Sequence, residues 1–180
     1  SHALRAACDA VLVGVGTVLA DDPRLTVRMV PGASPIRVVL DPQLRIPGHA
    51  RVLEDDGVTT IVTTSASSPE RRAELRRRGV SIVVVPAGSE GLDLTAALEA
   101  LFADGIRSLL VEGGARVITS FLSRGLADRL VVAIAPRVMG SGTDAVNDLG
   151  ITEVASAIRL ERRAVHVAGD DVLIAGDLAT

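Results

Sequence analysis

Short unbroken runs of Val, Leu, Ile and Ala alternate along this chain with stretches whose apolar residues recur at helical spacing. A short apolar run bounded by glycine or polar residues is typical of a strand buried on both faces of a parallel sheet. Such runs predict strands over residues 9–13, 36–40, 59–63, 80–85 and 109–111. Strands that alternate with helices indicate an α/β fold with a mainly parallel, three-layer architecture.

Two of the intervening helices carry recognisable start signals. Ser68 stands immediately before Pro69, and Asp93 opens the second helix. Serine and aspartate side chains cap the first turn of a helix, and proline suits its first position. The pattern therefore predicts helices over residues 69–78 and 93–103. The arginine-rich face of the first helix is interleaved with glutamates, which favours a solvated surface over a nucleic-acid site.

The last third of the chain has a different pattern. Strands are predicted over residues 129–135, 157–167 and 172–178, and the turn 169–171 joins the last two closely. We therefore expect a C-terminal antiparallel hairpin beside the mainly parallel sheet.

One strand–turn–helix unit ends in a carboxylate and a glycine pair. The apolar run 109–111 leads into Glu112, then Gly113 and Gly114, and a helix with apolar residues at helical spacing follows. Glycines allow a diphosphate to approach the backbone, and the first turn of a helix attracts anions. Glycine pairs are equally common as tight connections without a ligand, so this motif gains weight only with a second one.

The second motif lies near the amino terminus. Strand 9–13 runs into Gly14-Val15-Gly16, and Thr17 stands where a helix begins, with a hydroxyl suited to a phosphate or ribose oxygen. Because the third glycine of the usual dinucleotide fingerprint is absent, the motif fails as a conventional GxGxxG pattern. Asp21 lies in the residues that follow this turn.

Arginines cluster around the second motif. Arg5, Arg24 and Arg28 together predict a clamp for a phosphorylated substrate, because a guanidinium matches phosphate geometry. Each arginine taken singly is more often a surface ion-pair partner.

Composition narrows the chemistry. The 180 residues carry 19 basic and 22 acidic side chains, a net charge of −3, with no Trp and no Tyr. Nothing here suggests nucleic-acid binding, and the longest apolar run is too short to span a bilayer. The single cysteine fits a reducing compartment, so we expect a cytoplasmic protein.

Several classes of catalytic site are missing from the sequence. It contains no P-loop, no metal-binding motif and no nucleophile elbow, and its three histidines are scattered. We read the histidines as structural or exposed. Glycine turns, hydroxyls, one carboxylate and arginines suit a reaction in which a cofactor does the chemistry, with hydride transfer as the first candidate.

Four segments carry a resemblance to a known family. They are DAVLVGVGTVLADDPRLTVR, PIRVVLDPQLRIP, LLVEGGARVITSFLSRGLADRLVVAIAPRVMG and GDDVLIAGDL. Together they resemble the riboflavin-biosynthesis pyrimidine reductases, the reductase half of the bifunctional deaminase–reductase. The resemblance covers almost the whole chain and implies a dihydrofolate-reductase-like fold.

The resemblance implies NADPH-dependent reduction of the ribosyl group of a phosphoribosylamino-pyrimidine to a ribityl group. It also implies residue roles, with Glu112 as the candidate catalytic group. The implied cofactor-binding residues are Thr17, Asp21, Gly113, Gly114, Ala115, Arg116, Val117, Ile118, Thr119 and Ser120. The implied substrate-binding residues are Arg5, Leu25, Arg28 and Glu112. No metal is implied, and the family commonly has a cis peptide between Gly113 and Gly114.

The chain departs from the family pattern in two places. Family members often carry a small hydroxyl residue near NADPH where this chain has Pro42, and Arg45 nearby is a candidate to compensate by pairing with the 2′-phosphate. The family's first strand is expected before Ser1, so we interpret residues 1–180 as a single reductase domain lacking that strand.

Two other readings of the function stay open at this point. One is a related reductase of a different substrate such as a pterin, against which the phosphate-binding arginines argue. The other is a non-catalytic nucleotide-binding scaffold. The resemblance further implies a homodimer, for which strand residues 130–134 offer an apolar interface, and an upstream deaminase domain.

Overall fold

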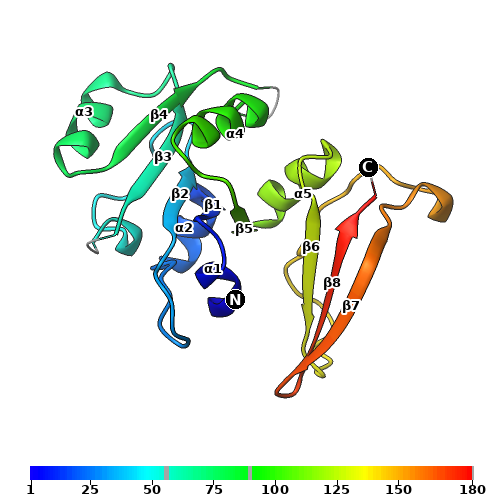
Figure 1. Cartoon of the computed structure of the whole chain (residues 1–180). Helices are drawn as coiled ribbons and strands as arrows, with labels where there is room; N and C mark the ends of the chain where they lie inside the picture. Colours follow the sequence, from blue (N-terminus) through cyan, green and yellow to red (C-terminus); the bar gives the residue numbers. More distant parts are fainter. Residues whose placement is uncertain (55–56, 89–90, 180) are drawn as a thin grey trace. The chain divides into compact units, whose positions relative to one another are not determined.

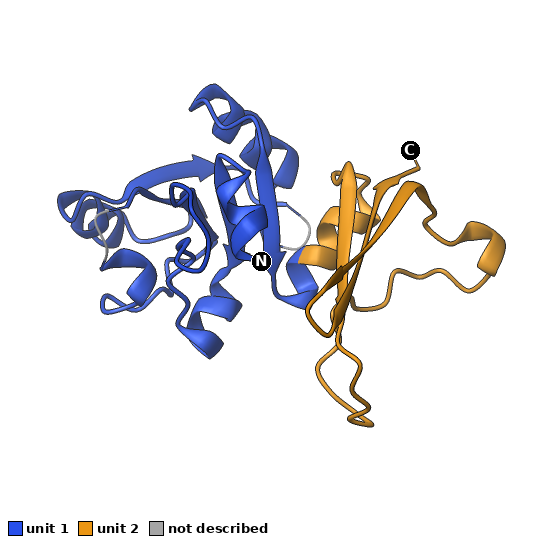
Figure 2. Cartoon of the chain, turned by 60° about the horizontal axis from the view of Figure 1, so that its bottom comes forward, with its two compact units in different colours: residues 1–117 blue, residues 118–180 orange. Residues whose placement is uncertain are grey.

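The computed structural model describes residues 1–54, 57–88 and 91–179. The chain divides into two compact units, residues 1–117 and 118–180, which are coloured separately in Figure 2. Within the described ranges, no helix combines the length and the apolar character needed to cross a membrane.

The first unit is built on a five-stranded parallel sheet with the order β4-β3-β2-β1-β5 (Figure 1). The chain lays β1 to β4 side by side in one direction and then returns to the other side of β1 for β5. The predicted strands and their parallel arrangement are confirmed. The strands are β1 (Ala10–Gly14), β2 (Ile36–Leu40), β3 (Thr59–Thr64), β4 (Ser81–Val85) and β5 (Leu109–Gly113).

Two helices of this unit begin where the sequence predicts, whereas the helix expected from Thr17 begins two residues earlier, at Val15. Ser68 Oγ accepts a hydrogen bond from the Arg71 N–H at 3.2 Å, and Asp93 Oδ1 accepts one from the Ala96 N–H at 3.1 Å. Arg71 pairs with Glu74 at 2.7 Å, as expected for a solvated helix face. The helical elements are α1 (His2–Ala6), α2 (Val15–Asp21), η1 (Arg51–Leu53), α3 (Pro69–Arg77) and α4 (Leu94–Ala103). Helix α5 (Ala115–Ser123) crosses the boundary between the units after Val117.

The core of the first unit consists of aliphatic side chains from the central strands. Val11 and Val13 of β1, Val39 of β2 and Ile61 of β3 are at most 1% exposed. Burial of each such side chain contributes about 1.5–3 kcal/mol relative to leaving it in water. This packing fixes the strand ends that carry the glycine turns.

Strand β5 differs from the prediction of a strand buried on both faces. Within the described residues it pairs with β1 alone and stands at the edge of its sheet, where Leu109 to Glu112 are half-buried. An apolar run reports the residue types of a strand and says nothing of how many neighbours the strand has.

The second unit contains a three-stranded antiparallel sheet with the order β6-β8-β7. The predicted hairpin of the last two strands is confirmed, and β6 extends it on the far side of β8. The elements are β6 (Arg129–Ile134), η2 (Val154–Ser156), β7 (Leu160–Ala168) and β8 (Asp171–Leu178).

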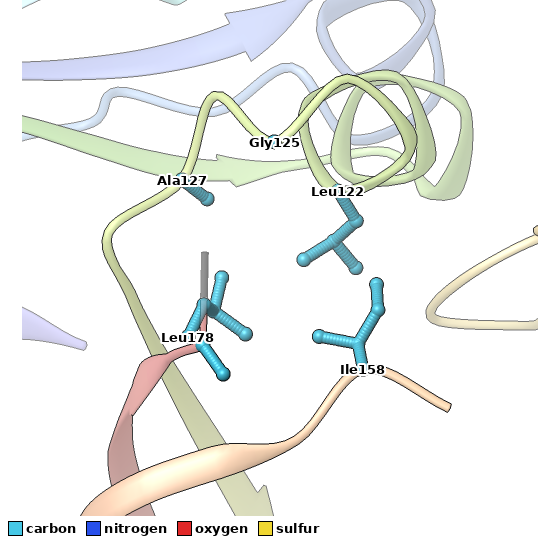
Figure 3. Close-up of a pocket in the computed structure, with 6 residues that line it drawn as sticks. Leu122, Gly125, Ala127, Ile158 and Leu178 are labelled. Atoms are coloured by element: carbon cyan, nitrogen blue, oxygen red, sulfur yellow. The ribbon is translucent and has the colours of Figure 1, made fainter. Parts of the chain in front are cut away.

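A small apolar cavity lies inside the second unit. Figure 3 shows Leu122, Ile158 and Leu178 converging on it, and its volume is about 80 Å³. Cavities that bind cofactors are several times larger, at roughly 300–1,000 Å³. This cavity is therefore too small to hold a dinucleotide cofactor.

Candidate functional site

The order of strands in the first unit reverses between β1 and β5. The connections from β1 lead away on one side, through β2 to β4, and the chain comes back to β5 on the other side. In open parallel sheets, ligands bind outside the carboxyl ends of the strands at such a reversal. Both glycine segments singled out in the sequence lie at this point. The turn predicted at Gly14-Val15-Gly16 is absent: Gly14 ends β1, and Val15 and Gly16 already belong to α2. We keep the name glycine turns for these two strand-to-helix junctions.

The two turns pack directly against each other. A Cβ atom placed on Gly14 would lie 2.8 Å from Val117 Cγ2, and one placed on Gly114 would lie 3.1 Å from Thr17 Oγ1. A Cβ on Gly113 would be 3.0 Å from Val13 Cγ1 and 3.1 Å from Thr17 Oγ1. Side chains at Gly113 and Gly114 would therefore fill the space around the Thr17 hydroxyl, and one at Gly14 would collide with Val117 of α5.

The glycine pair has an ordinary peptide bond and an unusual backbone angle. The bond between Gly113 and Gly114 is trans, so the cis peptide implied by the family resemblance is absent. Gly114 has φ of +73°, a left-handed conformation that a residue with a side chain adopts only with strain.

The two predicted cofactor residues of α2 lie at opposite ends of that helix. Thr17 is half-buried in the first turn, and Asp21 is exposed in the last turn. The next residue, Asp22, ends the helix in a left-handed conformation and accepts a hydrogen bond from the Arg51 N–H at 2.8 Å. The α2 segment is thereby tied to the loop that follows β2.

The predicted cofactor residues of α5 divide between the units. Ala115, Arg116 and Val117 form its first turn in the first unit. Ile118, Thr119 and Ser120 belong to the second unit, where Thr119 Oγ1 accepts a hydrogen bond from the Asn147 N–H at 2.8 Å.

Arg5 and Glu112 form a bidentate ion pair. Arg5 Nε donates to Glu112 Oε1 at 2.8 Å and Arg5 Nη2 donates to Oε2 at 2.5 Å, while Arg5 Nη1 reaches the Thr26 carbonyl at 3.2 Å. The two side chains are only 11% and 17% exposed, so the pair is largely shielded from solvent. The structure thus joins two predicted substrate residues, and their pairing was not anticipated from the sequence.

The segment containing Leu25 and Arg28 runs past α1. The Arg28 N–H donates a hydrogen bond to His2 Nδ1 at 3.2 Å. This contact between His2 and the segment fits the structural role expected for the histidines. Arg28 itself is exposed. Leu25 is 2% exposed with φ of +58°, so its side chain belongs to the core and only its backbone remains to face a substrate.

Asp9 links the amino ends of strands β1 and β5, at the end of the sheet opposite the glycine turns. Its Oδ2 accepts hydrogen bonds from the N–H groups of Arg107 and Ser108 at 2.9 and 2.8 Å, which lowers the pKa of the carboxyl. Partial burial, with a smaller contribution from Asp9, raises the pKa of the neighbouring Cys8 thiol. Both side chains lie at the amino ends of the strands, away from the glycine turns, and we interpret their role as structural.

Comparison with known protein families identifies the family of this chain. The family model of the RibD C-terminal domain matches residues 1–174. The chain belongs to this family. The resemblance to the pyrimidine reductases of riboflavin biosynthesis is thereby confirmed. Membership in this reductase family implies a nicotinamide cofactor.

Two similar relatives illustrate the range of the family. A protein of Methanothermobacter thermautotrophicus named 2,5-diamino-6-ribosylamino-4(3H)-pyrimidinone 5′-phosphate reductase is 47% identical over 96% of this chain and 81% of its own length. The riboflavin biosynthesis protein RibD of Aquifex aeolicus is 41% identical over 97% of this chain and 48% of its own. The chain therefore spans about half the length of the RibD protein that it matches.

Solved structures show the same fold. RibD of Acinetobacter baumannii superposes with a TM-score of 0.85 at 27% identity, covering 99% of this chain and 49% of that one. The riboflavin biosynthesis reductase Rib7 of Saccharomyces cerevisiae gives a TM-score of 0.76 at 26% identity, with 99% and 78% covered. The α/β fold class expected from the sequence is confirmed.

Among the described residues, no group of three or more His, Cys, Asp or Glu side chains is arranged to hold a metal ion.

Proposed function

We propose that this protein reduces the ribosyl group of a ribosylamino-pyrimidine 5′-phosphate to a ribityl group, with NADPH, as a step of riboflavin biosynthesis. One observation carries the proposal. A chain of the RibD C-terminal domain family places two interlocked glycine turns at the strand reversal, beside the Arg5–Glu112 ion pair.

The residues at the turns fit a dinucleotide cofactor. Gly113 and Gly114 keep the space around the Thr17 hydroxyl clear of side chains, and the first turn of α5 attracts a diphosphate through the helix dipole. We assign Thr17, Asp21 and residues 113–120 to cofactor binding. When bound, NADPH supplies the hydride; the protein supplies binding and orientation.

The ion pair suits a positioning role toward the substrate. Because Arg5 holds both carboxylate oxygens of Glu112, the carboxylate has one orientation and is available to accept hydrogen bonds from ribose hydroxyls. Glu112 is the residue we assign to orienting the reacting sugar. We assign binding of the substrate phosphate to Arg28, which is exposed and lies two residues after Thr26, whose carbonyl oxygen binds Arg5. We assign further contacts with the substrate to Arg5 and to the backbone of Leu25.

The greater length of some family members leads us to expect a further domain beside the reductase domain. RibD proteins are about twice as long as this chain, and we propose that a deaminase domain accompanies the reductase upstream. We also propose that residues 1–180 form a single reductase domain of a cytoplasmic homodimer. Val132 and Ile134 of β6 are 38% and 47% exposed, which supports the predicted apolar interface.

Substrate-dependent oxidation of NADPH tests the proposed reaction. The chain is mixed with NADPH and either the 2-amino or the deaminated ribosylamino-pyrimidine 5′-phosphate, and loss of nicotinamide absorbance is followed together with the ribityl product. We expect turnover with at least one of them. NADPH that binds but is consumed with neither substrate would overturn the proposed reaction, and a pterin run in parallel would identify a different reductase.

Binding of NADPH provides the companion test of the site. With no Trp or Tyr in the chain, the fluorescence of the cofactor itself reports its binding. Thr17→Val removes the hydroxyl at nearly constant volume and should weaken binding about tenfold, the usual loss of one hydrogen bond to a charged group. Thr95→Val, on the exposed face of α4, is the matched control and should bind as the parent chain does. If both variants bind NADPH with equal affinity, Thr17 does not contribute to cofactor binding.

A further inference from the structure

The segment that carries Arg28 has no helix or strand of its own. It lies between α2, which ends at Asp21, and β2, which begins at Ile36. Backbone N–H and C=O groups in such a segment lack the partners that a helix or sheet provides, so side chains or water must bond them. The contacts made by this backbone therefore decide how firmly Arg28 is held.

Helix α1 holds the segment at two points. The Thr26 carbonyl oxygen accepts a hydrogen bond from Arg5 Nη1, and the Arg28 N–H donates one to His2 Nδ1, both at 3.2 Å. Arg5 is itself fixed, because its Nε and Nη2 donate to the two carboxylate oxygens of Glu112. His2 is thus the second side chain through which α1 fixes the backbone of this segment.

Two further contacts complete the anchoring. The Val27 N–H donates a hydrogen bond to Ser34 Oγ at 3.0 Å. Leu25 is 2% exposed and belongs to the core cluster of the first unit. Each residue from 25 to 28 therefore has either a buried side chain or a backbone group bonded to a side chain.

The side chain of Arg28 contrasts with its backbone. It is exposed, and its guanidinium has no hydrogen-bond or ion-pair partner among residues 1–54, 57–88 and 91–179. A long side chain loses conformational freedom when it binds an anion, and a fixed backbone reduces that loss because fewer positions of the guanidinium are accessible beforehand. Anchoring the backbone of Arg28 thereby favours binding of a phosphate by its side chain.

On the basis of the proposed function, in which Arg28 binds the substrate phosphate, we propose that His2 is a positioning residue that raises the affinity for this substrate. His2 acts through the hydrogen bond that its ring nitrogen accepts from the Arg28 N–H. Glu112, which we assign to orienting the reacting sugar, is held by Arg5 and not by His2. Loss of the His2 contact should therefore raise KM and leave kcat nearly unchanged.

Steady-state kinetics of the full chain test this role, with saturating NADPH and the ribosylamino-pyrimidine 5′-phosphate that the parent chain reduces. His2→Leu and His2→Asn have similar shapes, but only Asn has an acceptor oxygen on Cγ, where histidine has Nδ1. We expect His2→Leu to raise KM about 3- to 10-fold, the usual effect of one neutral hydrogen bond, and to change kcat less than twofold. His2→Asn should recover most of the loss. His166→Leu, at an exposed position of β7, is the matched control and should change neither constant.

A double-substitution cycle tests whether His2 acts through Arg28. Arg28→Gln removes the charge assigned to the phosphate and should raise KM about 10- to 100-fold. In that background His2→Leu should have no further effect, because the guanidinium that His2 positions is already gone. A further 3- to 10-fold rise in the double variant would overturn the proposal, since His2 would then act independently of Arg28.

The remaining outcomes distinguish the role of His2 from the proposed function. If the parent chain reduces the substrate and His2→Leu has the same KM, His2 is not a positioning residue while the reductase stands. A loss that His2→Asn does not recover would also overturn the role, because the acceptor would not be the feature that matters. If the parent chain reduces neither pyrimidine, the proposed function itself fails, and the role of His2 toward the substrate fails with it.

Discussion

The two units of this chain bury their side chains very differently. Among the described residues, every buried apolar side chain belongs to the first unit except Phe121. The second unit instead leaves apolar side chains in solvent, such as Val165 and Val167 of β7, which are 65% and 77% exposed.

This difference in packing indicates which unit can hold the residues of a binding site in fixed positions. A site needs side chains fixed by packing and hydrogen bonds, and a close-packed core transmits that rigidity to the turns at its edge. In the first unit the fully buried strand β1 leads directly into one glycine turn, and the neighbouring edge strand β5 carries Glu112 and leads into the other. The exposed valines of the second unit suit a surface that another chain or segment covers.

The largest contrast is expected from two glutamates, one in each unit. Glu112→Gln removes the charge that faces Arg5 and leaves a largely buried guanidinium without its ion pair, so kcat/KM should fall on the order of 100-fold. Glu161→Gln on the exposed part of β7 is the matched control. Substrate-dependent NADPH oxidation measures both, and equal activity of the two variants would contradict the role of Glu112.

Two glycines with similar backbone angles sharpen the comparison for cofactor binding. Gly114 has φ of +73° and Gly169 has φ of +66°, so alanine at either position costs about 1 kcal/mol of strain. Only at Gly114 would the added methyl approach Thr17 Oγ1, at 3.1 Å. We expect Gly114→Ala to raise the NADPH Kd about tenfold and Gly169→Ala to leave it unchanged. Parallel changes in the two variants would point to strain alone.

Two valines compare the packing of the units directly. Val39 is fully buried in β2 and Val167 is 77% exposed in β7. Val39→Ala should lower the free energy of unfolding by about 2 kcal/mol, from lost methyl groups and the cavity left behind, whereas Val167→Ala should stay within about 0.5 kcal/mol. Urea unfolding at equilibrium measures both. A larger loss for Val167→Ala would mean that β7 is covered in solution.

The smallest effect concerns pH. Two backbone N–H groups lower the pKa of Asp9 below its ordinary value of 3.8, so its stabilising contribution is complete above that pH and is lost as pH falls through the lower folded pKa. The urea midpoint of Asp9→Asn should therefore lie below that of the parent chain near neutral pH, and the two should converge in acid.

Local patterns in the sequence predicted most of the fold. Apolar runs located the strands of both sheets, and Ser68 and Asp93 marked helix starts that their side chains do cap. They did not show that β5 stands at an edge of its sheet, because strand order depends on the path of the chain between strands.

The candidate site was predicted less completely, for the same physical reason. The glycine turns are local motifs and stood out in the sequence. The Arg5–Glu112 pair joins residues 107 positions apart, and no local pattern reports it. Leu25 looks like an ordinary apolar residue of an extended segment, yet a left-handed backbone angle turns its side chain into the core.

We expect NADPH to bind at the strand reversal of the first unit. Mapping backbone amide chemical shifts on addition of NADPH tests it most directly, since each amide reports its own surroundings. We predict the largest changes in residues 14–21 and 113–117, with a further set at residues 41–46. Changes concentrated in strands β6 to β8, with the glycine turns unmoved, would contradict the account.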